Sequence, residues 1–217
     1  MSNVKVYNLP AGTGKTYQIV QDINEKISQG KDKILYITYT NRAKDEARKK
    51  IKYLTPSLQI DTVHSFVNEF LKNYLKEEKV VRFIKKEVFK NEIGPDEKGF
   101  YKYQPKKESA QGEIGHDDLM KVFTYLIVHE DFKGLQKNLL RLFDFIYIDE
   151  FQDLNLSFIL NMIRLYDSNM NHSTSKLFIY GDTTQAIYDP AKSYQEERER
   201  YCSDQKMMDE ILEYKET

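Results

Sequence analysis

The chain has 217 residues, 40% hydrophobic and 13% aromatic, which suffices for one domain with a sizeable core or for one domain that carries an insertion. Its 33 basic residues nearly balance its 34 acidic ones, so the net charge indicates no class of partner. No apolar run approaches the roughly 18 residues that span a bilayer, no signal peptide precedes Val4, and the single Cys202 excludes an intramolecular disulfide, so we expect a cytoplasmic protein without a membrane partner.

The first predicted strand leads directly into a glycine-containing loop. Residues 4–7 are rich in β-branched and aromatic side chains, and "PAGTGKT" (10–16) follows shortly after them. Apolar residues at helical spacing then indicate a helix that ends at Gly30. In such a loop backbone N–H groups bind a phosphate, Lys15 reaches the outer phosphates and the Thr16 hydroxyl holds Mg²⁺. A simple turn is the alternative, but the register of the Lys-Thr pair behind a strand favours phosphate binding.

The next predicted elements are a strand, a charged helix and a shorter strand. "KILYITYT" (33–40) is a strong strand candidate, and residues 41–54 follow as a helix with Asn41 at its N-cap. "SLQIDTVHSF" (57–66) is typical of a short strand that ends in a polar turn.

A long, mainly helical region runs from there to about residue 142, with breaks predicted near 91–100 and 104–118. Within it, residues 71–107 hold eleven Lys and Arg against six Asp and Glu, with Tyr and Phe interleaved. Such a segment is either a solvated helical face or a nucleic-acid contact, and the pattern leaves both possibilities open.

Two carboxylates stand at the end of the next apolar run, "FDFIYIDE" (143–150). In a phosphate-loop enzyme an acid at the position of Asp149 can hold Mg²⁺, and the next acid, Glu150, can orient or deprotonate the attacking water. An Asp-Glu pair after a strand is also common as a turn or helix cap. The Lys-Thr loop upstream favours the catalytic interpretation.

A helix over 154–166 and a last apolar strand over 175–182 complete the predicted elements. Gln185, just beyond that strand, could hydrogen-bond the terminal phosphate of a nucleotide. Five strands that alternate with helices predict an α/β fold with a parallel sheet covered on both faces. The remaining residues, 194–217, hold four basic and eight acidic residues, and we expect a solvated tail.

Taken in order, five blocks of the chain resemble the first RecA-like domain of superfamily 1 DNA helicases of the UvrD/Rep/PcrA type. They are "PAGTGKT" (10–16), "ITYTNRAKDEARKKI" (37–51), "DTVHSF" (61–66), "IYIDEFQDLN" (146–155) and "GDTTQAIY" (181–188), with "HDDLM" (116–120) as a further match. The resemblance implies a P-loop NTPase fold and an ATP-dependent helicase or ATPase that uses ATP and Mg²⁺. It divides the chain into a RecA-like domain (1–70 and 116–193), a helical insertion subdomain (71–115) and a charged C-terminal tail (194–217).

The resemblance also assigns roles to individual residues. The nucleotide-binding residues would be Pro10, Ala11, Gly12, Thr13, Gly14, Lys15, Thr16, Tyr17 and Gln185. Lys15, Glu150 as the base and Gln185 as the γ-phosphate sensor would serve catalysis, and Thr16 and Asp149 would hold Mg²⁺. The residues on the path of single-stranded DNA would be Thr38, Tyr39, Asn41, Thr62, His64 and Phe66. Aromatic faces can stack on bases, and hydroxyls can reach phosphates.

The chain departs from the family pattern in several places. Leu9 stands where relatives have Ala or Gly, Tyr17 replaces an Arg, and "DPAKSY" (189–194) replaces a segment with an aromatic residue and an Arg. Because only three residues precede Val4 in this sequence, we do not expect the segment that reads adenine in the family. Adenine selectivity therefore does not follow from the resemblance.

Two functions from different classes remain. The first is the ATP-binding motor half of a DNA helicase, which acts on single-stranded DNA and needs a second RecA-like domain or a partner subunit, because we expect none after residue 194. The second is a stand-alone nucleotide-binding regulatory or interaction module that unwinds nothing. Glu150 and Gln185 favour the first, and the altered "DPAKSY" segment favours the second.

Overall fold

The computed structural model describes residues 3–169, 171–185 and 206–214. They form two compact units. The sheet unit is built from the residues up to Thr62 together with those from Lys133 onward, and the helical unit is Val63–Phe132. The helical unit extends beyond the predicted insertion, 71–115, at both ends, because the helices that flank that segment pack on each other.

The sheet unit contains five parallel strands in the order β1-β7-β6-β2-β3. The strands are β1 (Val4–Asn8), β2 (Ile34–Thr38), β3 (Leu58–Thr62), β6 (Phe145–Ile148) and β7 (Lys176–Gly181). Four of them lie within the runs expected from sequence, and β1 extends one residue beyond the expected 4–7; the α/β fold with a parallel sheet is confirmed. Their apolar character follows from burial on both faces, as in other parallel sheets.

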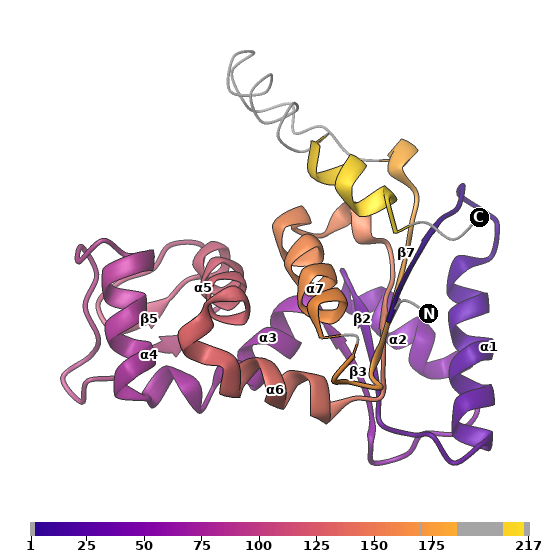
Figure 1. The fold of residues 1–217 in the computed structure, drawn as a ribbon, viewed down its shortest axis with the longest axis horizontal. Helices are drawn as coiled ribbons and strands as arrows, with labels where there is room; N and C mark the ends of the chain where they lie inside the picture. The colour runs from indigo at the N-terminus through magenta and orange to yellow at the C-terminus, as the bar shows by residue number, and fades with distance from the viewer. Residues whose placement is uncertain (1–2, 170, 186–205, 215–217) are drawn as a thin grey trace. The chain divides into compact units, whose positions relative to one another are not determined.

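Helices cover both faces of this sheet (Figure 1). They are α1 (Lys15–Ser28), α2 (Asn41–Lys50) and α7 (Leu156–Ser168), and α6 (Lys133–Leu142) precedes β6. Ile19 and Ile23 of α1 and Ala47 of α2 share one core with Tyr36 and Tyr147 of the sheet. Alternate strand residues point to the other face, where α7 contacts β1 and β7. None of the helices in the described residues combines the length and the apolar character that a membrane crossing requires.

The helical unit begins without a turn after β3. The predicted strand over 57–66 ends at Thr62, and α3 (Val63–Leu71) starts at the next residue. The expected polar turn is therefore wrong, because Val63, Phe66, Val67 and Leu71 are buried at helical spacing. The unit's other elements are η1 (Tyr74–Lys76), α4 (Glu78–Phe83), η2 (Ile84–Val88), β4 (Lys102–Tyr103), β5 (Glu113–Ile114), α5 (His116–Val128) and η3 (Glu130–Phe132). The short β4–β5 pair was not predicted.

The described end of the chain is a helix over 206–212. Its Ile211 is fully buried, and its Glu210 forms an ion pair of 2.8 Å with Arg164 of α7. The backbone N–H of Val6 on the edge strand β1 donates to the carbonyl of Tyr214 at 3.2 Å. This part of the predicted tail, 194–217, is therefore packed rather than solvated on one face. The "DPAKSY" segment lies outside the described residues.

Candidate nucleotide-binding site

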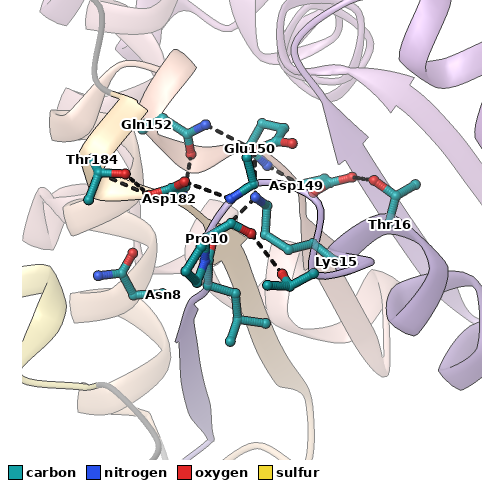
Figure 2. A network of polar contacts seen from close by, with 12 residues as sticks. Asn8, Pro10, Lys15, Thr16, Asp149, Glu150, Gln152, Asp182 and Thr184 are labelled. Atoms are coloured by element: carbon teal, nitrogen blue, oxygen red, sulfur yellow. Dashed lines mark hydrogen bonds and ion pairs between the residues drawn. The ribbon is translucent and has the colours of Figure 1, made fainter.

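The polar motif residues of the sheet unit meet at the carboxyl-terminal edge of the sheet. β1 leads into the loop 9–14, β6 is followed by Asp149 and Glu150, and β7 is followed by Asp182. Figure 2 shows side chains from these three strand ends pointing toward one another. Ligands of open parallel sheets bind at this edge, because loops and helix N-termini converge there.

The loop after β1 has the backbone of an anion-binding loop. Gly12 and Gly14 have φ of 75° and 83°, in the left-handed region that favours glycine. Thr13 folds back and donates its hydroxyl to the carbonyl of Pro10 at 2.8 Å. Gly14 precedes α1, and no side chain caps the helix. The first N–H groups of α1 therefore remain open to a phosphate, and the helix dipole favours negative charge there.

Lys15 is held inside the site although its side chain is charged. The side chain is 5% exposed, and its ammonium lies 3.6 Å from Oε2 of Glu150. It also donates to the carbonyl of Leu9 at 3.3 Å. A buried ammonium with so few partners can be satisfied by a bound phosphate, since phosphate oxygens accept several charge-assisted hydrogen bonds.

Thr16 and Asp149 form a pair suited to a magnesium ion. The Thr16 hydroxyl donates to Oδ2 of Asp149 at 2.8 Å, and the buried Tyr36 hydroxyl donates to the same oxygen at 2.7 Å. Burial raises the pKa of Asp149 and also that of Tyr36, so Tyr36 stays a neutral donor. Mg²⁺ typically takes one or two protein oxygens together with phosphates and waters. The two residues fit this role.

Glu150 has an unusual backbone that turns its carboxylate into the site. Its φ is 51° and its ψ is 52°, a left-handed conformation that is uncommon outside glycine and costs of order 1 kcal/mol or more. Oε2 accepts a hydrogen bond from Gln152 Nε2 at 2.9 Å. The nearby Asp153 has a raised pKa, first because of burial and then because of the charge of Glu150.

Asp182 connects the end of β7 with the phosphate loop, a role that was not predicted from the sequence. Its Oδ2 accepts from the Ala11 N–H at 2.9 Å, and its Oδ1 accepts from the Thr184 hydroxyl at 2.6 Å. The hydrogen bond from Thr184 holds the pKa of Asp182 below its usual range. Asn8 forms a second connection between the ends of β1 and β7, because its side chain exchanges two hydrogen bonds of 3.0 Å with Thr183.

Of two further residues predicted for the nucleotide site, Tyr17 and Gln185, the structure describes the side chain of Tyr17 alone. Tyr17, on the first turn of α1, is 64% exposed next to the loop, where it can meet a bound nucleotide. Gln185 ends a 3-10 turn (Thr183–Gln185), but its side chain lies outside the described part of the chain. Its role as a phosphate sensor stays a prediction.

The residues predicted for the DNA path are not equally accessible. Tyr39 is 51% exposed and Asn41 is exposed at the start of α2, whereas Thr38 and Thr62 are buried at their strand ends. In the helical unit His64 is half-buried and stacks on His116, with ring centroids 3.5 Å apart.

Phe66 packs in the core of the helical unit. It is 2% exposed and lies against Phe70 and Phe123. A ring buried in this way offers no face to a base. Phe66 is therefore not among the residues proposed to contact DNA.

The loop, the lysine and the two acids at the edge of a parallel sheet define a P-loop nucleotide-binding domain. A family model described as an AAA domain, AAA_19, matches residues 2–191, and the chain belongs to this family. A probable DNA helicase of Mycoplasma pneumoniae is 28% identical over 244 aligned positions, which cover 86% of this chain and 45% of that protein. The Gabija protein GajB of Bacillus cereus is 28% identical over 122 positions, which cover 50% of this chain and 17% of GajB.

The family match and these similarities support a P-loop domain of the helicase type. The chain spans less than half the length of the two curated relatives it matches.

Proposed function

We propose that the chain is the ATP-binding motor half of a superfamily 1 DNA helicase of the UvrD/Rep/PcrA type. It couples ATP hydrolysis to movement on single-stranded DNA when a second RecA-like domain completes it. The observation that carries the proposal is the meeting of Lys15, Thr16, Asp149 and Glu150 at one sheet edge. The similarity to a protein described as a probable DNA helicase supports the DNA part.

The hydrolysis step assigns one task to each side chain. Lys15 leaves Glu150 and binds the outer phosphates, while the backbone N–H groups of the loop hold the β-phosphate. Thr16 and Asp149 would hold Mg²⁺, which would supply positive charge to neutralise the phosphates. Glu150 accepts a proton from a water molecule while the oxygen of that water attacks the γ-phosphorus. The bond between the γ-phosphorus and the β-phosphate oxygen breaks, and ADP and phosphate leave.

The contact with single-stranded DNA is proposed for the segment between β2 and α2. Tyr39 offers an exposed ring, and the exposed Asn41 and the N-terminus of α2 follow it directly. The N-cap of α2 is Thr40 rather than the expected Asn41: its side chain accepts from the Ala43 N–H at 3.1 Å, which fixes the backbone of this turn. The basic segment 71–107 is a weaker candidate, because Arg82, Lys86 and Lys106 already pair with neighbouring acids.

The experiment compares Glu150→Gln with the wild type in two measurements. Calorimetric titration with ATP and Mg²⁺ should give similar affinities, because the base acts only in the transition state. Single-turnover hydrolysis of labelled ATP by excess protein should fall by about 10²–10⁴-fold. Asp149→Asn should instead lose the Mg²⁺-dependent part of the affinity.

Each outcome separates the motor from the binding module. A wild type that binds ATP but never hydrolyses it, even over many hours, would support the stand-alone module. If Glu150→Gln and Asp149→Asn behaved alike in a Mg²⁺ titration, the division of roles between the two acids would be wrong.

A further inference from the structure

In Figure 2, Gln152 lies between Glu150 and Asp182, and both ends of its side-chain amide form hydrogen bonds. Its Nε2 donates to Oε2 of Glu150 at 2.9 Å. Its Oε1 accepts from the backbone N–H of Asp182 at 2.9 Å. An amide that is satisfied on both sides in this way has a defined orientation, since exchanging its oxygen and nitrogen would break both bonds.

The close approach of Gln152 to β7 requires a glycine at the end of that strand. A Cβ on Gly181 would collide with the Phe151 ring and with Oε1 of Gln152. The backbone of Gly181 does not have a positive φ, so the space above it, rather than its conformational freedom, explains the residue. Gly181 and Gln152 therefore form one packed contact.

The contact continues to the phosphate loop through Asp182. The Asp182 backbone binds Gln152, and its carboxylate binds the Ala11 N–H on the loop. A chain of hydrogen bonds thus runs from the loop, through the end of β7, to the carboxylate of Glu150.

We propose that Gln152 is a positioning residue, which orients the carboxylate of Glu150 for hydrolysis and ties it to the Gly181–Thr184 turn. The inference rests on the proposed function. In the part of the chain that the structure describes, Oε2 of Glu150 has two partners, Lys15 at 3.6 Å and Gln152 at 2.9 Å. A nucleotide that takes Lys15 away leaves Gln152 as the group that keeps the carboxylate in place, which is the state in which the base acts.

The test replaces Gln152 in two ways and compares binding with chemistry. Gln152→Met removes both hydrogen bonds, whereas Gln152→Glu keeps the acceptor for the Asp182 N–H and loses the donor to Glu150. ATP affinity in the presence of Mg²⁺ should stay within about two-fold for both, because neither variant removes a phosphate ligand. The single-turnover rate should fall by roughly 10–10²-fold for both, as expected for a misplaced reacting group. The matched control is Gln21→Met, on the exposed face of α1.

A second readout follows the Asp182 amide by hydrogen exchange. Its exchange should accelerate in Gln152→Met and stay slow in Gln152→Glu, although both variants lose rate. Gly181→Ala, which pushes the side chain aside, should reproduce the slow hydrolysis, with little further loss in the double variant with Gln152→Met.

The outcomes distinguish this inference from the proposed function. Wild-type hydrolysis with unchanged rates in both Gln152 variants would overturn the positioning role alone. A Gln152→Glu variant with wild-type hydrolysis would show that only the packing against β7 matters, which also overturns it. A wild type that never hydrolyses ATP would overturn the proposed function, and this inference with it, since a base with no reaction needs no positioning.

Discussion

Tyr39 and Tyr53 are two tyrosines of similar exposure at opposite edges of the sheet, 51% and 56% exposed. Tyr39 follows the carboxyl end of β2, whereas Tyr53 lies between α2 and the start of β3. If a base stacks on Tyr39, Tyr39→Ala should weaken the binding of single-stranded DNA by about 1–3 kcal/mol. Tyr53→Ala should leave it unchanged. Fluorescence anisotropy with a labelled oligonucleotide at low salt measures both, and equal effects of the two variants would contradict the placement of the DNA path.

At the candidate nucleotide site, sequence patterns predicted the residues that are proposed to act directly on a phosphate or a metal. Lys15, Thr16, Asp149 and Glu150 follow from short motifs, because the chemistry fixes both residue type and spacing. Asp182 was missed, because its bond to Ala11 joins positions 171 residues apart and no local pattern encodes such a contact. The only signal for Asp182 in the sequence was a Gly-Asp pair after an apolar strand. Gln152, three residues beyond Asp149, was likewise not predicted as a site residue.

The contact between α3 and α5 contains a titratable pair, which makes its stability depend on pH. Burial, and then the neighbouring His116, lower the pKa of His64 to about 4. The imidazole of His64 takes up a proton near pH 6.5 in the unfolded chain but only near pH 4 in the folded chain. The free energy of unfolding therefore has its full value above pH 6.5 and decreases as the pH falls toward 4. Because the ring is half-exposed, we expect a loss of only about 1–2 kcal/mol over this range.

His64→Phe keeps an aromatic ring against His116 but cannot titrate. Its free energy of unfolding, from denaturant titrations at several pH values, should change less between pH 6.5 and 4 than that of the wild type. His172→Gln, at an exposed site, is the matched control and should follow the wild type. The same pH dependence in wild type and His64→Phe would contradict the prediction.

At the scale of elements, the sheet unit was predictable and much of the helical unit was not. Strands such as β2 and β6 are apolar because helices cover both of their faces, so they stand out in the sequence. The boundary at Thr62 was missed, because strand and helix follow without a turn and Val63 and Phe66 suit either element. The β4–β5 pair has two residues per strand and depends on tertiary contacts rather than on a periodic pattern.

At the scale of the whole molecule, the residues proposed to bind phosphate and metal meet at one edge of the sheet, whereas two of the described arginines form ion pairs away from it. Arg42 pairs with Glu46 on the surface of α2, and Arg164 pairs with Glu210. Among residues 3–169, 171–185 and 206–214, no arginine shares a hydrogen bond or ion pair with Lys15, Asp149 or Glu150. An arginine at the γ-phosphate contributes about 10³–10⁵ in rate, because it neutralises charge that develops in the transition state.

We therefore predict that the 217-residue chain alone binds ATP and Mg²⁺, hydrolyses ATP far more slowly than the ~10 s⁻¹ typical of enzymes, and unwinds no duplex. Adding a second RecA-like domain, fused in cis or supplied as a partner subunit, should raise turnover and make it sensitive to single-stranded DNA. Lys15→Ala should abolish this increase in turnover. Lys31→Ala, at an exposed site before β2, is the matched surface control. Steady-state ATPase assays with and without oligonucleotide measure the effect. Turnover near ~10 s⁻¹ from the chain alone would show that it completes its own site and needs no second domain for chemistry.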